Sequence, residues 1–279
     1  MYDCIGKILV TGANGMLGRD LCPMLEDCGY EVIETDIDNM DITDELTTMR
    51  VISDVKPDFV IHCAGYTNVD KAEDDLKTAK LINEKGTENV AKACKANNAT
   101  IIYISTDYVF DGTSTKPYQP DSKTCPINNY GLTKSKGEEV IQKHCEKYYI
   151  ARTSWLYGHH GRNFVETMIS LAEQKELKVV DDQVGCPTWT IDLSDAIINL
   201  IEDEAEYGIY HTCGGGSTSW YGFAKQIFEY MGIKANLIPC STGDFPRKAK
   251  RPSQSVMDNE NRLRDWKLAL KEYIELRIE

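Results

Sequence analysis

The segment Val10-Thr11-Gly12-Ala13-Asn14-Gly15-Met16-Leu17-Gly18 decides the fold of this chain. Its glycines follow Gly-x-x-Gly-x-x-Gly spacing, between an apolar run at 7–11 and helical periodicity at 16–28. A side chain at the first glycine would obstruct the tight turn, one at the second would hold the backbone away from a pyrophosphate, and one at the third would disturb helix–strand packing. The helix N-terminus then offers free N–H groups to an anion. The segment therefore predicts a dinucleotide-binding βαβ unit, with a purely structural turn as the alternative.

Strand and helix patterns alternate beyond this turn. Apolar and β-branched runs predict strands at 31–36, 58–63, 99–105 and 148–153. Helical periodicity predicts helices at 43–55, 75–97 and 130–147. Continuously apolar strands such as 99–105 are typical of a parallel sheet that is buried on both faces. We therefore expect an α/β fold with a doubly wound parallel sheet of the Rossmann type.

The alternation loosens in the C-terminal half. Turn-forming residues predict a loop at 111–129, and periodicity predicts helices at 163–174, 191–202 and 219–230 with a short strand at 178–181. We expect residues 1–158 to form mainly the dinucleotide-binding Rossmann domain. Residues 159–279 then form mainly a smaller C-terminal substrate-binding lobe over the carboxyl edge of the sheet, with some segments returning to the Rossmann core.

Composition limits the partners of the chain. The 279 residues carry a formal net charge of −13, which repels phosphate backbones and anionic membranes at long range. No apolar stretch has the length of a membrane span, and the first ten residues do not have the pattern of a signal peptide. We therefore expect a cytoplasmic protein that binds neither nucleic acid nor membrane.

The chain contains ten cysteines, at positions 4, 22, 28, 63, 94, 125, 145, 186, 213 and 240. None form a Cys-x-x-Cys pair, and several lie in apolar runs. We interpret them as free, mostly buried thiols of a reducing cytoplasm rather than a disulfide or metal framework. The five histidines also lack the spacing of metal ligands, so no metal site is predicted.

The second predicted strand ends at Asp36, where a carboxylate can bind the ribose hydroxyls of a dinucleotide. A carboxylate there repels the 2′-phosphate of NADPH and so favours NADH, while Arg19 can bind that phosphate, so use of both cofactors stays open. A simple turn residue is the alternative for Asp36. The third strand leads into Ala64-Gly65-Tyr66-Thr67, where small residues allow the backbone to approach the adenosine side, unless a tight turn alone explains them.

The fourth strand runs into Ser105-Thr106-Asp107, and Tyr130 and Lys134 follow downstream. A threonine hydroxyl at a strand's carboxyl end can hydrogen-bond a substrate carbonyl. Tyr130 and Lys134 stand four residues apart and share one helix face, so the ammonium is expected to lower the pKa of the phenol. Tyr130 can then donate a proton to the oxygen as hydride arrives at the carbon, and Lys134 can hold the nicotinamide ribose. A solvated helix face is the usual meaning of Tyr-x-x-x-Lys alone, and its place after this strand and this glycine turn favours catalysis.

Five motifs together resemble the dTDP-4-dehydrorhamnose reductase branch of the extended short-chain dehydrogenase/reductase family. They are the glycine turn at 12–18, Val69-Asp70-Lys71-Ala72-Glu73, Ser105-Thr106-Asp107-Tyr108-Val109-Phe110-Asp111-Gly112, Tyr130-Gly131-Leu132-Thr133-Lys134 and Arg152-Thr153-Ser154-Trp155-Leu156-Tyr157-Gly158. The resemblance extends to Asp182-Gln183-Val184-Gly185-Cys186-Pro187-Thr188 and Arg251-Pro252, and covers nearly the whole chain.

The resemblance implies a role for each site residue. Thr106 orients the keto oxygen, Tyr130 is the general acid, and Lys134 binds ribose and tunes Tyr130. Substrate contacts are implied for Thr106, Asp107, Tyr130 and Trp155, and Arg251 is expected to bind the pyrophosphate of the sugar nucleotide. Core packing is the alternative for Trp155, and a solvated cationic loop is the alternative for Arg251. Cofactor contacts are implied for Gly12, Asn14, Gly15, Met16, Leu17, Asp36, Asp41, Ile42, Ala64, Gly65, Tyr66, Thr67, Tyr130 and Lys134.

The implied reaction is NADH- or NADPH-dependent reduction of the C4 keto group of a dTDP-4-keto-6-deoxy-L-sugar to dTDP-L-rhamnose. One alternative is another nucleotide-sugar epimerase, dehydratase or reductase of the same fold; a dehydratase typically has Asp-Glu after the threonine, where this chain has Asp107-Tyr108. The other is a non-catalytic regulatory subunit that keeps the fold. Some relatives dimerise through a Mg²⁺ ion held by acidic side chains; Asp20 matches that pattern loosely, so monomer, homodimer and metal stay open.

Overall fold

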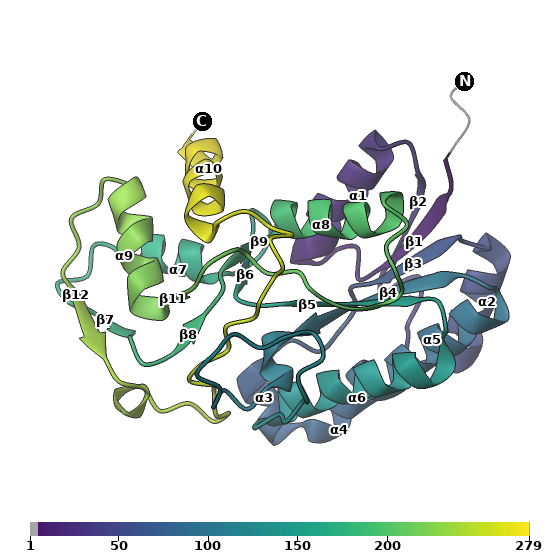
Figure 1. Cartoon of the computed structure of the whole chain (residues 1–279), viewed down its shortest axis with the longest axis horizontal. Coiled ribbons are helices and arrows are strands. Elements are labelled where there is room, and N and C mark those ends of the chain that lie inside the picture. Colours follow the sequence, from purple (N-terminus) through teal and green to yellow (C-terminus); the bar gives the residue numbers. More distant parts are fainter. Residues whose placement is uncertain (1–4, 279) are drawn as a thin grey trace.

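The structure is a computed structural model that describes residues 5–278 (Figure 1). Its centre is a six-stranded sheet in the order β10-β5-β4-β3-β1-β2, and every neighbouring pair is parallel. The strands are β1 (Lys7–Thr11), β2 (Glu31–Thr35), β3 (Phe59–His62), β4 (Thr100–Thr106), β5 (Tyr148–Thr153) and β10 (Gly208–His211). The strand order reverses direction between β1 and β3, which opens a ligand crevice at their carboxyl ends. The predicted doubly wound parallel sheet is confirmed.

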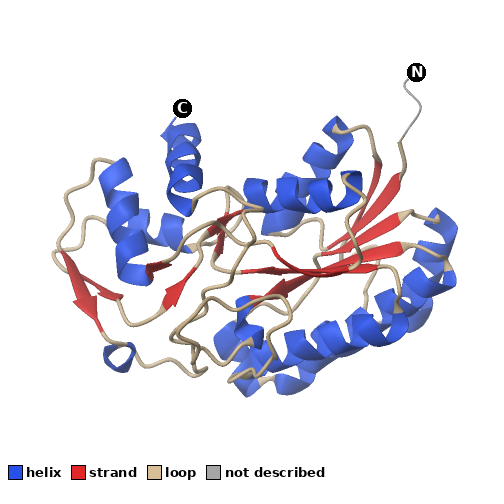
Figure 2. Ribbon diagram, in the orientation of Figure 1, coloured by secondary structure: helices blue, strands red, loops and turns tan. Residues whose placement is uncertain are grey.

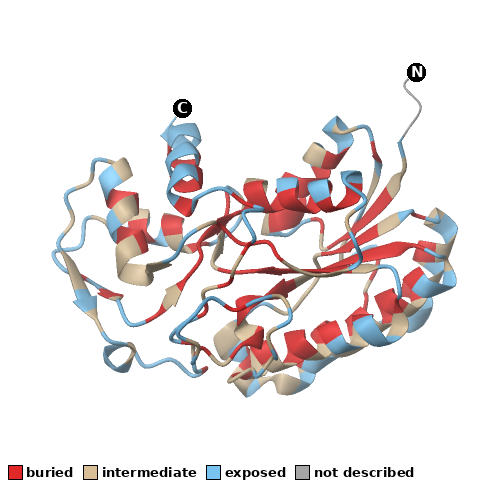
Figure 3. Ribbon diagram, in the orientation of Figure 1, coloured by how far each residue is buried: buried red, intermediate tan, exposed pale blue. Residues whose placement is uncertain are grey.

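Helices cover both faces of the sheet (Figure 2). On one face, α1 (Met16–Asp27) packs beside α8 (Thr190–Glu202), and their apolar side chains share a buried cluster with β1. On the other face, α2 (Glu45–Val55), α5 (Thr87–Ala96) and α6 (Asn129–His144) lie side by side over β3 and β4. Both faces of the sheet are therefore buried from solvent, and buried residues concentrate along the sheet (Figure 3).

The helix predicted at 75–97 is present as one continuous helical run, but its middle turn is π-helical. It begins with α4 (Leu76–Lys80), passes through a π-helical turn, η1 (Leu81–Gly86), and continues as α5, and the short helix α3 (Val69–Asp74) precedes it. The wide turn lets the Asn83 side chain reach back to the Tyr66 backbone. It also places Gly86 against Ile42, where an added Cβ would lie 2.8 Å from the Ile42 side chain. Tertiary contacts, which periodicity does not record, therefore decide the helix geometry here.

The smaller lobe lies beyond the carboxyl end of β5, because β5 leads directly into it through Trp155 (Figure 2). Its helices are α7 (Phe164–Ser170), α9 (Trp220–Tyr230) and α10 (Trp266–Ile278), which share one aromatic-rich core. Three strand pairs support them: β6 (Leu156–Tyr157) with β9 (Thr188–Trp189), β7 (Leu177–Val180) with β12 (Leu237–Cys240), and β8 (Val184–Gly185) with β11 (Thr218–Ser219). Two 3₁₀ turns, η2 (Asp107–Val109) and η3 (Thr242–Asp244), complete the fold.

Two segments of the C-terminal half leave the lobe and join the Rossmann core. Helix α8 packs on α1, and β10 is the edge strand beside β5. Sequence periodicity predicted the helix but not the strand, because Gly208–His211 is only four residues long and half-exposed.

The nine cysteines of the described part are free, and five of them are buried. The tenth, Cys4, lies outside the described residues. Within 5–278, no helix is both long and apolar enough to cross a bilayer.

Candidate active site

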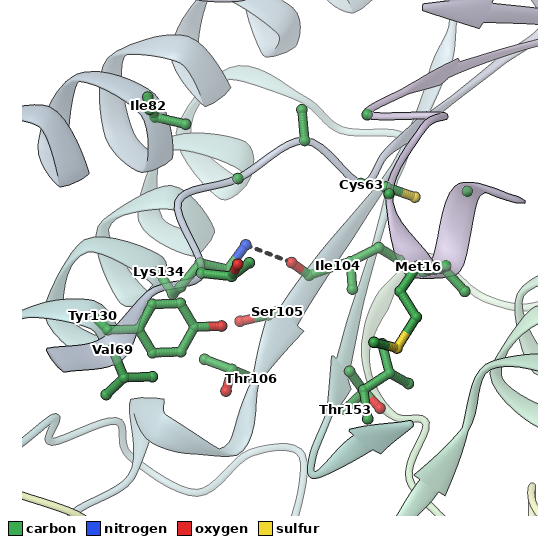
Figure 4. A pocket seen from close by; sticks show the side chains of 18 of the residues that line it. Met16, Cys63, Val69, Ile82, Ile104, Ser105, Thr106, Tyr130, Lys134 and Thr153 are labelled. Atoms are coloured by element: carbon green, nitrogen blue, oxygen red, sulfur yellow. Dashed lines mark hydrogen bonds between the residues drawn. The ribbon is translucent and has the colours of Figure 1, made fainter. Parts of the chain in front are cut away.

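A cavity of about 900 Å³ opens where the carboxyl ends of the sheet strands face the lobe (Figure 4). Its walls come from the glycine turn, the ends of β2, β3 and β4, the start of α6, and the lobe residues Trp155, Leu156, Arg162 and Trp220. This volume is at the upper end of the range for small-molecule sites. The cavity therefore has room for a large ligand, and it spans both parts of the molecule.

The glycine turn is shaped as the spacing predicted. Gly12 has a φ of +65°, and a Cβ there would lie 2.7 Å from the Ala64 backbone nitrogen. A Cβ on Gly18 would lie 2.5 Å from the Ala13 carbonyl oxygen, so this glycine lets the first turn of α1 pack closely on the glycine turn. Gly15 caps α1 without any side-chain hydrogen bond. The first N–H groups of α1 are therefore available to an anion in the cavity.

Asp36 lies just beyond β2 and lines the cavity. Its carboxylate accepts hydrogen bonds from the backbone N–H of Asn14 (3.0 Å) and of Ile37 (2.8 Å). Arg19 donates from Nε to the Asn14 carbonyl at 3.0 Å. A carboxylate, Asp36, and a guanidinium, Arg19, therefore both lie beside the glycine turn.

The three residues of the predicted catalytic set meet in one corner of the cavity. The Tyr130 hydroxyl points from α6 toward Ser105 and Thr106 at the tip of β4 (Figure 4), and the Thr106 hydroxyl is within hydrogen-bonding reach of the phenol. Lys134 lies one helical turn further along, where Nζ donates to the Ile104 carbonyl at 2.6 Å and lies 4.1 Å from the centre of the Tyr103 ring. β3 ends at His62, opposite Tyr103 of β4. β4 therefore extends beyond the end of β3 into the crevice.

The expected lowering of the Tyr130 pKa by Lys134 is wrong for this structure. Burial raises the pKa of Tyr130 to about 12, and the Thr106 hydroxyl opposes that rise. The ammonium does not contribute because it is turned toward Ile104 and Tyr103. Burial instead lowers the pKa of Lys134 to about 7, with Glu138 opposing. At neutral pH the phenol is therefore protonated and can act as an acid.

Asp107 follows Thr106 and is buried. The Thr106 hydroxyl donates to Asp107 Oδ1 at 3.1 Å, while Oδ2 has no partner among the described residues. Burial raises the pKa of Asp107 to about 6, against the hydroxyls of Ser255 and Thr106. Thr153 Oγ1, at the end of β5, is a second buried oxygen of the cavity wall without a partner in 5–278. Buried polar atoms are almost always paired, so both are candidates for ligand contacts.

Trp155 and Trp220 stack at the lobe end of the cavity. Their ring centroids are 3.5 Å apart and the planes differ by 4°. Trp155 adopts a φ of +47°, which is rare for a bulky side chain. Gly185 makes the arrangement possible, because a Cβ there would lie 2.5 Å from the Trp155 ring. Backbone strain of this kind is typical of functional sites.

The structure does not bring Arg251 to the cavity wall. Its guanidinium donates to both carboxylate oxygens of Asp70 on α3, at 2.6 and 2.8 Å, and to the Ala249 carbonyl at 2.6 Å. The pair joins the 245–256 segment to the Rossmann domain. The role of Arg251 toward a pyrophosphate stays a prediction.

Most of the other predicted site residues line the cavity together. They are Gly12, Gly15, Met16, Leu17, Asp36, Asp41, Ile42, Ala64, Gly65, Thr67, Thr106, Asp107, Tyr130, Lys134 and Trp155. Asn14 and Tyr66 are adjacent to it through their backbones, which bond Asp36 and Asn83.

Sequence reasoning missed several residues at this site, including Thr153, whose hydroxyl has no hydrogen-bond partner within residues 5–278. Trp220 and Arg162 line the cavity from the lobe, far in sequence from the motifs. Asn83 holds the Tyr66 backbone and donates to Thr133 Oγ1 at 3.0 Å. A polar residue on the apolar side of a predicted helix was the available signal for Asn83, and no signal marked Trp220.

A parallel doubly wound sheet, a glycine turn at its switch point and a Tyr/Lys pair beside the strand tips define a protein of the short-chain dehydrogenase/reductase class. The chain belongs to the RmlD substrate binding domain family, whose model matches residues 6–277.

Comparison with known proteins gives full-length relatives. The chain is 42% identical to the spore coat polysaccharide biosynthesis protein SpsK of Bacillus subtilis, over 97% of this chain and 98% of that protein. It superposes on the crystal structure of a dTDP-4-dehydrorhamnose reductase from Clostridium acetobutylicum with a TM-score of 0.95 at 46% identity, covering 98% of this chain and 100% of the other. It also superposes on dTDP-4-dehydrorhamnose reductase from Bacillus anthracis in complex with NADP, with a TM-score of 0.94 at 40% identity, covering 97% and 99%.

Proposed function

We propose that this protein reduces the C4 keto group of dTDP-4-dehydrorhamnose to give dTDP-L-rhamnose, using NADH or NADPH. One observation carries the proposal: the Tyr130 phenol lies within hydrogen-bonding reach of the Thr106 hydroxyl at a strand tip, in the same cavity as an open glycine turn. Full-length relatives named dTDP-4-dehydrorhamnose reductase support the choice of substrate.

The residues of the cavity fit a dinucleotide. The bare turn at Gly12 and Gly15 leaves the α1 N-terminus open to a pyrophosphate, and Asp36 can accept ribose hydroxyls. At the other end, Lys134 can donate to the nicotinamide ribose from beside the Ile104 carbonyl. A bound reduced nicotinamide supplies the hydride.

Proton transfer follows from Tyr130. Because burial holds the pKa of Tyr130 near 12, the hydroxyl keeps its proton at neutral pH until negative charge develops on the substrate oxygen. Thr106 can donate to the same oxygen and so polarise the carbonyl. Asp107 Oδ2 and the Trp155 ring then face the sugar.

The choice between NADH and NADPH depends on the ribose end of the cavity. The Asp36 carboxylate, held by two backbone hydrogen bonds, disfavours a 2′-phosphate by repulsion of like charges. Arg19, near the start of α1, carries a positive charge that can offset the negative charge of that phosphate. The NADP in the Bacillus anthracis relative supports use of NADPH.

A direct assay tests the proposal. The purified protein is incubated with dTDP-4-dehydrorhamnose and either NADH or NADPH, nicotinamide absorbance is followed, and the product is identified by NMR. We expect absorbance to fall only when sugar nucleotide is present, with dTDP-L-rhamnose as product. Cofactor binding without turnover on this substrate would contradict the proposal and favour the regulatory-subunit alternative.

A further inference from the structure

Behind the tip of β4 lies a buried ion pair that has no role in the mechanism above. Arg152 donates from Nε to Glu138 Oε1 at 2.9 Å and from Nη2 to Oε2 at 2.7 Å, and both side chains are almost fully buried. Ser105 Oγ donates to the same Oε1 at 2.5 Å. Since Ser105 and Arg152 are opposite each other in the sheet register, one carboxylate joins α6 to β4 and to β5.

The position of Glu138 links it to two residues of the catalytic set. Ser105 directly precedes Thr106, and Glu138 stands one helical turn beyond Lys134 on α6. The helix packs closely on the strand here, since a Cβ on Gly137 would lie 2.2 Å from the Tyr103 hydroxyl. The carboxylate thus holds the strand tip against the helix that carries Tyr130 and Lys134.

Glu138 is negatively charged, whereas the other titratable groups that face Lys134 are neutral near pH 7. The titratable groups that face this amine are His62 and Cys63 at the end of β3, Tyr103 on β4, and Tyr130 and Glu138 on α6. Burial lowers the pKa of His62 to about 3 and raises the pKa of Cys63, Tyr103 and Tyr130, so these four are neutral near pH 7. Among the described groups facing Lys134, Glu138 is therefore the one carboxylate.

We infer that Glu138 is a positioning residue, whose carboxylate fixes Thr106 through Ser105 and, from one helical turn away on α6, favours the charged form of Lys134. A buried ammonium without an anion nearby releases its proton readily, and a neutral amine makes weaker hydrogen bonds to ribose hydroxyls. The catalytic part of this inference rests on the proposed function. The electrostatic part concerns the free protein and is tested separately.

The electrostatic part is tested by titrating Lys134 in cofactor-free protein, with ¹³C-labelled lysine side chains followed by NMR and the signal assigned by its loss in Lys134→Met. In Glu138→Gln, which keeps the shape and removes the charge, we expect the Lys134 midpoint to fall by about one pH unit. The matched control is Glu139→Gln, which removes the same charge from the exposed face of α6, where Glu139 pairs with Lys136. An unchanged midpoint in Glu138→Gln overturns this part.

Glu138→Gln leaves the Arg152 guanidinium buried without its anion, so this variant can fail to fold. In that case Arg152→Met is compared with the Glu138→Gln/Arg152→Met double variant, so that the arginine charge is absent from both proteins. We expect the lower Lys134 midpoint in the double variant, and equal midpoints in these two variants overturn the electrostatic part.

The positioning part is tested with Ser105→Ala, which removes one hydrogen bond and leaves the ion pair intact. We expect kcat to fall about tenfold while KM changes less than about threefold, because a displaced Thr106 misplaces the reacting carbonyl. The Lys134 midpoint should stay at its wild-type value. Wild-type kcat in Ser105→Ala overturns the positioning part.

These outcomes separate the inference from the proposed function. If wild-type protein does not reduce the sugar nucleotide, the proposed function fails and the NMR titration still decides the electrostatic part. If wild-type protein is active and the Lys134 midpoint is the same in Glu138→Gln, the inference about charge fails alone.

Discussion

The two ends of the cavity are built in different ways. At the Rossmann end, the functional groups are held by backbone: the buried Lys134 by the Ile104 carbonyl, and the partly exposed Asp36 by two backbone N–H groups. At the lobe end, the wall includes two stacked indoles, Trp155 just after β5 and Trp220 at the start of α9.

The difference indicates a division of work. The Rossmann end keeps a buried amine and a buried phenol in place, which reduces stability but needs no reorganisation during reaction. The lobe end provides flat apolar surface, which suits recognition of a large substrate. We therefore expect changes at the Rossmann end to alter kcat or cofactor binding, and changes at the lobe end to alter KM.

The largest effect is expected from Tyr130→Phe. Loss of the proton donor should lower kcat by about 10³-fold, while cofactor affinity stays within a few fold because the ring remains. Steady-state kinetics and a cofactor fluorescence titration measure the two quantities. Tyr148→Phe, at the far end of β5, is the matched control. Near-normal turnover in Tyr130→Phe would show that this residue is not the general acid. It would also contradict the assignment of kcat effects to the Rossmann end of the cavity.

Lys134→Met should separate stability from function. The folded-state pKa of about 7 lies below the ordinary value of 10.5, so the buried ammonium destabilises the fold, fully below pH 7 and progressively less up to pH 10.5. We expect the free energy of unfolding of Lys134→Met to exceed that of the wild-type protein by about 1–2 kcal/mol at pH 6, and by less at pH 9. Cofactor affinity should fall about tenfold. Denaturant unfolding at both pH values measures the gain, and a gain that grows with pH contradicts the account.

Gly185→Ala tests the lobe end. The new methyl group would collide with the Trp155 ring, and overpacking of this kind costs about 1–3 kcal/mol. We expect KM for the sugar nucleotide to rise about tenfold with kcat within about threefold. Loss of the stacked-indole signal in far-UV circular dichroism should accompany it. Gly208→Ala is the control, since its Cβ would meet open space. A fall in kcat at unchanged KM would refute the assignment of recognition to this end.

The smallest effect is expected from the Arg251–Asp70 pair. The pair holds the pKa of Asp70 near 2, because the guanidinium donates to the carboxylate. Since both side chains are partly exposed, Arg251→Gln and Asp70→Asn should each cost about 1 kcal/mol or less of unfolding free energy. We expect KM to change less than threefold in both. A large rise in KM confined to Arg251→Gln would instead support the predicted pyrophosphate contact.

Contiguous motifs made one end of the cavity predictable. The glycine turn, Asp36 and the Tyr130–Lys134 spacing each encode a local geometry, because turn conformation and helix face depend on neighbouring residues alone. Alternating strand and helix patterns likewise predicted the parallel sheet, including the five strands that begin the fold.

The other end depends on residues that are distant in the chain. Trp220 reaches Trp155 only because β8 pairs with β11, and two-residue strands leave no periodic signal. The η1 turn forms for the same reason, since Asn83 and Gly86 meet partners 17 and more residues away.

The sequence by itself determined the fold class, the nucleotide turn and the identity of the catalytic candidates, because those properties follow from local spacing and residue type. Only the tertiary structure decided where the charges point. It turned Lys134 toward Ile104 and away from the Tyr130 hydroxyl, paired Arg251 with Asp70, and buried Glu138 behind the β4 tip. Protonation and ion pairing depend on burial and on partners from other elements, and a linear pattern records neither.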